Sequence, residues 1–195
     1  KIWTSGGHSA DWGWLACRTE PDAPKHRGIS LFTIKMDTPG IQTRPLVNMA
    51  GTHEFNEIFF EDVRVPAANL VGEENRGWYN VAVGLDFERS SIGATSNSRR
   101  MVDDLVTYLR TEKPRIDNAV KHRLVDEAIG VALLRNMAYY IASRQEKTGI
   151  APTREAQMAK LFGAELQQRI AATALQVFGM EGQAHRPVSR AASYR

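Results

Sequence analysis

The sequence has few of the features that mark secreted or membrane-spanning proteins. It contains one cysteine, Cys17, in 195 residues, so no internal disulfide can form, which fits a reducing compartment. No apolar run approaches the roughly 18 residues that a membrane-spanning helix requires, and no signal-peptide pattern opens the chain. These absences favour a soluble, cytoplasmic protein without a membrane span.

A concentration of charge is also missing. The formal net charge is +3, and the basic residues are scattered among acidic ones, without a dense basic run interleaved with aromatic side chains. Nucleic acid is therefore not indicated as a partner. The chain begins with Lys1-Ile2-Trp3 rather than an initiator methionine and enters strand-like sequence at once. We expect it to be a piece of a longer polypeptide.

The spacing of apolar residues changes once along the chain. Short strands separated by turn sequences are predicted at residues 2–4, 12–17, 29–34, 41–47 and 55–65. From about residue 75 the period becomes helical, and four helices are predicted: Gly77 to Leu109, Asp117 to Glu146, Thr153 to about Val177, and one that starts near Pro187. Thr153 is the expected cap of the third helix.

These patterns predict an α+β fold in two domains. Residues 1–72 are expected to form an antiparallel sheet or small barrel, and residues 73–195 a truncated antiparallel four-helix bundle. In the second of these helices, the expected path of the apolar face is marked by Leu124, Ala128, Val131, Ala132 and Arg135.

One acidic residue interrupts an apolar stripe in the first predicted helix. At 100° per residue, Val81, Leu85, Glu88 and Ile92 fall within roughly 60° of one another. Burying an unpaired carboxylate is costly, so Glu88 is either neutralised by Arg89 or another basic residue, exposed at a helix edge, or used for chemistry.

Six strings of residues resemble the acyl-CoA dehydrogenase family in order and spacing. They are KIWTSGG at 1–7, DTPGI at 37–41, FFEDVRVP at 59–66, NLVGEENRGW at 69–78, LDFER at 85–89 and QVFG at 176–179. The resemblance spans essentially the whole chain and implies the C-terminal half of an enzyme that holds FAD against an acyl-CoA thioester. It also implies a homodimer or homotetramer and an electron-transferring flavoprotein as electron acceptor.

The resemblance assigns roles to particular residues. Trp3, Thr4 and Ser5 match the segment that lies along the flavin ring, where a hydroxyl near flavin N5 can form a hydrogen bond and an indole excludes solvent. The turn formed by Gln176, Val177, Phe178, Gly179 and Met180 matches the one that meets the FAD of a neighbouring subunit.

The predicted chemistry is proton removal coupled to hydride transfer. Most members of the family carry the catalytic glutamate on a later loop, but a minority place it at the position of Glu88. Glu88 is therefore the predicted base for the α-proton, while the β-hydride leaves to flavin N5. Asp86, Phe87 and Arg89 are predicted to contact the acyl-CoA.

The sequence departs from the family at three places. Met180 and Glu181 replace a usual pair of glycines, and the 110–115 segment lacks the Arg-x-x-Phe-Gly motif that contacts FAD across the dimer. Residues 52–57 replace a version rich in serine and threonine, and His53 is expected to be a surface or loop histidine without a metal partner.

Two other functions stay open. A flavin monooxygenase on the same fold would need no base at residue 88. A non-catalytic partner subunit of a heteromeric dehydrogenase would explain the altered FAD contacts at 110–115.

Overall fold

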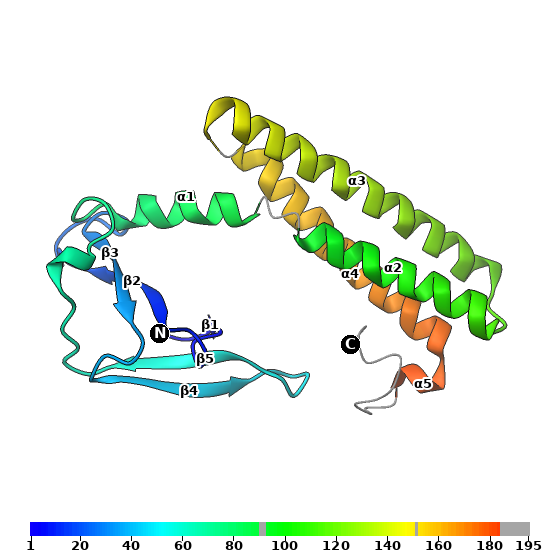
Figure 1. Ribbon diagram of the computed structural model, residues 1–195, viewed down its shortest axis with the longest axis horizontal. Coiled ribbons are helices and arrows are strands. Elements are labelled where there is room, and N and C mark those ends of the chain that lie inside the picture. Colours follow the sequence, from blue (N-terminus) through cyan, green and yellow to red (C-terminus); the bar gives the residue numbers. More distant parts are fainter. Residues whose placement is uncertain (90–92, 151, 184–195) are drawn as a thin grey trace. The chain divides into compact units, whose positions relative to one another are not determined.

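The computed structural model describes residues 1–89, 93–150 and 152–183, and it divides into two compact units, Lys1–Gly84 and Leu85–Arg195 (Figure 1). The first unit holds antiparallel sheets and the second holds long helices, which confirms the α+β class. The predicted domain limits of 1–72 and 73–195 rest on the change of sequence pattern and stay a prediction.

The first unit contains two open sheets. Strand β1 (Thr4–Ser5) pairs with β5 (His53–Phe60), which pairs with β4 (Ile41–Val47). Strand β2 (Trp12–Arg18) pairs with β3 (Ile29–Lys35). All three pairings are antiparallel, and the described strands do not close into the small barrel that was the alternative expectation.

Strand β4 lies at the edge of its sheet, and its sequence suits that position. It contains Pro45, which has no N–H to donate to a second neighbour. Cys17 lies half buried in β2, where burial raises the pKa of its thiol and keeps it protonated.

Helix α1 (Gly77–Arg89) starts directly against β3. A Cβ on Gly77 would overlap the backbone of Ser30 and Leu31, so only glycine allows this approach. Ser30 is wholly buried and its hydroxyl accepts a hydrogen bond from the Asn75 backbone at 2.8 Å. The link between the short 3-10 turn at Ala67–Asn69 and α1 is therefore fixed to the sheet.

The remaining helices are α2 (Gly93–Glu112), α3 (Asn118–Thr148), α4 (Thr153–Phe178) and the short α5 (Met180–Gln183). The single helix predicted from Gly77 to Leu109 is thus described as α1 and α2, which flank residues 90–92. The helix predicted from Pro187 lies outside the described residues. Asp117 caps α3 by accepting a hydrogen bond from Ala119 N at 3.1 Å.

Thr153 is not the cap of α4, so that prediction was wrong. Pro152 occupies the cap position without a side-chain hydrogen bond, and Thr153 is the first helical residue. Its hydroxyl is used elsewhere, because it donates to Asp86 Oδ2 at 2.7 Å.

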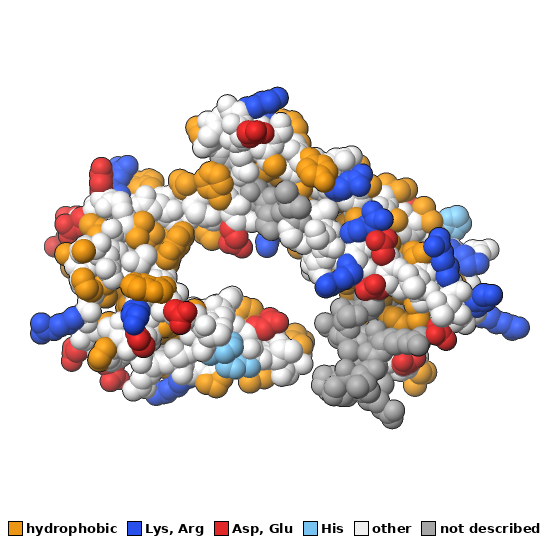
Figure 2. Space-filling view, viewed as in Figure 1, with side chains coloured by type: hydrophobic (Ala, Val, Ile, Leu, Met, Phe, Trp, Pro, Cys, Tyr) orange, Lys and Arg blue, Asp and Glu red, His pale blue; other side chains and the backbone are white. Residues whose placement is uncertain are grey.

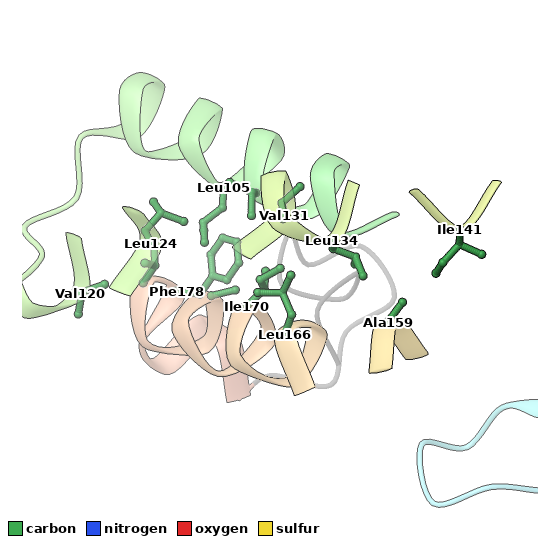
Figure 3. Close-up of a cluster of buried hydrophobic side chains, with 13 residues drawn as sticks. Leu105, Val120, Leu124, Val131, Leu134, Ile141, Ala159, Leu166, Ile170 and Phe178 are labelled. Atoms are coloured by element: carbon green, nitrogen blue, oxygen red, sulfur yellow. The ribbon is translucent and has the colours of Figure 1, made fainter. Parts of the chain in front are cut away.

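Helices α2, α3 and α4 bury one continuous apolar cluster (Figure 3). Gly130 of α3 faces α4 so closely that a Cβ there would lie 2.9 Å from Leu166 Cδ1. Met158 and Leu161, also on α4, stay exposed in the described part of the chain. The buried members of the cluster are Val102, Leu105, Val120, Leu124, Val131, Leu134, Ile141, Ala159, Leu166, Ile170, Ala174, Val177 and Phe178.

Candidate functional site

Ile2 and Trp3, just before β1, form a β-bulge against β5. Lys1 and Ile58 exchange both backbone hydrogen bonds, at 2.7 and 2.8 Å, and Thr4 lies opposite Asn56. Two residues, Ile2 and Trp3, therefore face the single residue Glu57. Such bulges locally bend a strand and change the direction in which its side chains point.

The backbone of this bulge is strained at Trp3. Its φ of 65° lies in the left-handed region, which costs a bulky residue on the order of 1–3 kcal/mol. The indole stays 59% exposed and contacts Phe55 edge-on, with ring centroids 5.8 Å apart. Ser5, two residues on, is also exposed. A strained backbone thus presents an aromatic face and a hydroxyl to the outside of the sheet.

A pocket of about 670 Å³ opens beside this segment in the same unit. Asn56, which is wholly buried, reaches it from β5, and the pocket wall includes both His8 and His53. The two imidazole rings lie 4.2 Å apart and tilted by 31°, and histidine side chains are visible at the surface of this unit (Figure 2). His53 is exposed, as expected.

Glu88 lies near the end of α1 and is exposed in the described chain. The described residues do not cover the apolar stripe that contains Glu88. Val81 is half buried and Leu85 is exposed, while Ile92 lies outside the described residues. The desolvation expected of Glu88 is therefore not supplied by the described residues.

The neighbours of Glu88 differ in how firmly they are held. The Asp86 carboxylate is half buried and accepts the hydrogen bond from Thr153, so it is anchored to the start of α4. Phe87 is exposed. Arg89 ends α1, and its side chain lies outside what the structure describes. Thr153 was expected to cap α4, so its hydrogen bond with Asp86 was missed.

The turn at 176–180 ends α4. Gln176 is exposed and its Oε1 accepts a hydrogen bond from Arg123 Nη2 at 2.7 Å. The side chains of Val177 and Phe178 are buried in the apolar cluster, so any contact they make outside the helices would come from their backbone. Gly179 adopts φ 56° with nothing within 4 Å of a Cβ, and the Met180 side chain is 80% exposed.

The helical unit also buries a glutamate that sequence reasoning missed. Glu127 is 4% exposed, and its Oε1 accepts the Thr173 hydroxyl at 2.6 Å, while its Oε2 has no hydrogen-bond partner in the described chain. Burial raises the pKa of Glu127, and the Thr173 hydrogen bond and the nearby Arg169 and Arg123 oppose that rise. It lines a pocket of about 360 Å³ between α3 and α4.

The comparisons agree with this architecture. Residues 75–195 match the family model described as acyl-CoA dehydrogenase, C-terminal domain. The chain belongs to the acyl-CoA dehydrogenase family. It is 33% identical over 192 residues to acyl-CoA dehydrogenase FadE29 of Mycobacterium tuberculosis, covering 96% of this chain and 49% of that protein. The chain spans about half the length of such curated relatives.

Solved structures of acyl-CoA dehydrogenases share the fold. The Tcur3481-Tcur3483 steroid ACAD is 28% identical to this chain, with a TM-score of 0.84. The match covers 100% of this chain and 52% of the solved chain. A chain of the ChsE4-ChsE5 complex from Mycobacterium tuberculosis is 29% identical to this chain, with a TM-score of 0.80. The match covers 100% of this chain and 51% of the solved chain.

Members of this acyl-CoA dehydrogenase family use FAD, and the described residues fit a flavin. The exposed indole of Trp3 and hydroxyl of Ser5 offer a flat apolar surface and a hydrogen-bonding group, and the open backbone at Gly179 allows close approach. Across residues 1–89, 93–150 and 152–183, no three His, Cys, Asp or Glu side chains are grouped to hold a metal ion. Within the same residues, no helix is long and apolar enough to cross a membrane.

Proposed function

We propose that the protein containing this chain catalyses the FAD-dependent α,β-dehydrogenation of an acyl-CoA thioester. The observation that carries the proposal is the bulged Trp3–Ser5 segment, in which a strained backbone holds an indole and a hydroxyl outward. Backbone strain of this kind concentrates at ligand-binding and active sites. When bound, FAD would accept the β-hydride of the substrate at flavin N5.

The chain supplies the groups that would orient and deprotonate the substrate. Ser5 presents a hydroxyl to the flavin, and Trp3 excludes water from its face. Glu88 removes the α-proton, and Asp86, Phe87 and Arg89 position the acyl-CoA. Asp86 suits this role because Thr153 holds its carboxylate in one place.

The exposure of Glu88 is compatible with its role as a base. Leu85 and Phe87, on the same stretch of α1, are both exposed apolar side chains. An acyl chain that packs on them would remove water from the neighbouring carboxylate. Binding of the substrate would then desolvate the Glu88 carboxylate at the moment when it acts as the base.

The helical unit favours assembly into a homodimer or homotetramer. Helices α3 and α4 expose a set of large apolar side chains beside a pocket of about 440 Å³, and such patches mark interaction sites. The 176–180 turn would meet the FAD of a neighbouring subunit, and an electron-transferring flavoprotein would reoxidise it. The exposed apolar residues on these helices include Ile129, Leu133, Tyr140, Met158 and Leu161.

One experiment tests the proposal on the intact protein. The protein is reconstituted with FAD and mixed anaerobically with a panel of acyl-CoA thioesters, and Glu88→Gln is compared with Glu146→Gln. Glu146 is an exposed glutamate near the end of α3 and serves as the matched control. We expect the flavin band to bleach in wild type and Glu146→Gln but not in Glu88→Gln, with acyl-CoA binding retained. Bleaching in all three would place the base elsewhere.

A non-catalytic partner subunit is the second candidate. The segment from Arg110 to Arg115 lacks the FAD-contact motif, and one similar structure is named as the ChsE4-ChsE5 complex. A protein that binds no FAD alone but gains it with a second subunit would favour this reading. FAD that acyl-CoA does not bleach, but that an added reductant bleaches and oxygen then reoxidises with formation of a hydroxylated product, would favour a monooxygenase.

A further inference from the structure

The Asn56 side chain lies in the middle of β5 and is wholly buried, yet each of its polar atoms has a partner. Asn56 Nδ2 lies 3.1 Å from the Thr4 carbonyl oxygen and 3.2 Å from His8 Nδ1. Asn56 Oδ1 lies 2.8 Å from His53 Nε2. One buried amide therefore links the bulged segment, the loop after it and strand β5.

The Thr4 carbonyl fixes the direction of every hydrogen bond in this network. A carbonyl oxygen only accepts, so the amide atom beside it must be the Nδ2 donor. Asn56 Oδ1 then faces His53, and His53 must donate from a protonated Nε2. The second hydrogen of Nδ2 points to His8, whose Nδ1 must be unprotonated to accept it.

The same geometry opposes a positive charge on His8. Protonation of Nδ1 would convert the acceptor into a donor that faces the Asn56 Nδ2 donor. It would also place a positive ring 4.2 Å from the His53 ring. Three other charged groups line this pocket: Asp11, and Lys35 and Asp37, which pair with each other at 3.0 Å.

We propose that Asn56 is a positioning residue that fixes the Thr4–Ser5 peptide, and that it does so only while His8 Nδ1 accepts a hydrogen bond from its amide. The bond to Thr4 holds the residue directly before the Ser5 hydroxyl and directly after the strained Trp3. The consequence for catalysis rests on the proposed function, because it assumes that Ser5 faces flavin. The anchor itself and its dependence on His8 do not rest on the proposed function.

Nitrogen-15 NMR of labelled histidine in the intact protein tests the hydrogen-bond directions. At pH 8 we expect His8 to be unprotonated at Nδ1 and His53 to be protonated at Nε2. A His8 ring that carries its proton on Nδ1 at this pH would overturn the network, whatever the protein catalyses.

Hydrogen exchange of the backbone over residues 3–7 tests the anchor. Asn56→Asp keeps the shape of the side chain but removes both Nδ2 hydrogens. The matched control is Asn69→Asp, because Asn69 Nδ2 also donates to a strand carbonyl, that of Thr33, at 3.1 Å. We expect exchange over residues 3–7 to be faster by about tenfold or more in Asn56→Asp and within about twofold of wild type in Asn69→Asp. Equal exchange in the two variants would contradict the proposal.

Two substitutions at His8 test its part in the anchor, with hydrogen exchange measured at one pH. His8→Asn places an amide oxygen near the position of Nδ1, so it should keep the protection of residues 3–7 seen in wild type. His8→Phe, which has no acceptor, should lose that protection. If His8→Phe is as well protected as wild type, the anchor does not depend on His8.

The rate of flavin reduction by acyl-CoA separates the structural anchor from its proposed consequence for catalysis. If wild type reduces its flavin, Asn56→Asp should slow reduction by at least tenfold at unchanged acyl-CoA affinity, whereas Asn69→Asp should not. An unchanged rate in Asn56→Asp would overturn the catalytic consequence. If wild type does not reduce its flavin, the proposed function fails while NMR and hydrogen exchange still decide the anchor.

Discussion

Thr173 donates its hydroxyl to Oε1 of Glu127 at 2.6 Å, across the interface between α4 and α3. The second carboxylate oxygen, Oε2, has no partner in the described chain, although Glu127 is almost completely buried. Burial raises the pKa of Glu127 above its ordinary value of 4.5. The helical unit should therefore respond to pH through this one residue.

The sign of that response follows from linkage. The folded protein holds the Glu127 proton to higher pH than the unfolded chain does, so the stabilisation is fully present below the unfolded pKa. It is lost as pH rises through the raised folded pKa. We expect Glu127→Gln, which mimics the protonated form, to gain stability relative to wild type as pH rises, by on the order of 1 kcal/mol. Chemical denaturation from pH 4.5 to 8.5 measures this, with Glu146→Gln as the exposed control. A constant difference between Glu127→Gln and wild type would refute it.

Gly130→Ala should destabilise the helical unit by about 1–3 kcal/mol, because the new Cβ would meet Leu166 Cδ1 at 2.9 Å in a closely packed core. Leu166→Val removes part of the obstructing side chain. The double variant should therefore lose less stability than the sum of the two single variants. Thermal unfolding of all four proteins gives the coupling, and strict additivity would show that the contact does not limit this position.

Thr153→Val should weaken acyl-CoA binding by roughly three- to tenfold, because it removes the hydrogen bond from the Thr153 hydroxyl to the Asp86 carboxylate. The rate of flavin reduction at saturating acyl-CoA should change little. Titration of the flavin spectrum with acyl-CoA measures both quantities. Thr111→Val is the control, since its hydroxyl donates only within α2, to the Thr107 carbonyl at 2.9 Å. An equal effect of both variants would remove Asp86 from substrate positioning.

Leu161→Lys should lower the oligomeric state, because it puts a charge into the exposed apolar set on α3 and α4. The control is Lys160→Gln, an exposed neighbour on α4 outside that set. Analytical ultracentrifugation should detect smaller particles for Leu161→Lys alone. An unchanged mass would mean that this face is not the subunit interface.

The strand part of the fold was predictable because turn residues and β-rich runs are local signals. Strands β2, β3 and β4 lie within one residue of their expected limits. Strand β5 starts at His53 and ends at Phe60, earlier than the predicted 55–65. That prediction extended an apolar run past the point where Asp62 turns the backbone to φ 48°. Whether the sheets close into a barrel depends on pairing between distant strands, which residue pattern alone does not specify.

Burial was harder to predict, as two glutamates show. The same helical arithmetic that singled out Glu88 places Glu127 in the stripe formed by Leu124, Val131 and Leu134, and Glu127 is the one that the described chain buries. The predicted path of α3 included the buried Leu124 and Val131, but it also ran through Ala128, Ala132 and Arg135, which are exposed. Alanine is a poor guide to the buried face of a helix, because its small side chain fits on either the buried or the exposed side.

The candidate site was predictable only in part. The strings around Trp3 and Glu88 indicated the family, which the comparisons confirm, but local sequence could not indicate the side-chain partners of these segments. Asn56 contacts Thr4 from 52 positions away, and Thr153 contacts Asp86 from 67 positions away. Such contacts arise from the tertiary fold.

The central claim, that the protein removes an α-proton and a β-hydride from an acyl-CoA, is tested most directly by isotopic substitution of the substrate. Anaerobic flavin bleaching is followed in the intact wild-type protein with an acyl-CoA deuterated at Cα, at Cβ, or at both. The account predicts that each substitution slows bleaching, since the Cα–H and Cβ–H bonds both break as Glu88 takes the proton and the flavin takes the hydride. Bleaching at the same rate with all substrates, or no bleaching with any acyl-CoA, would contradict it.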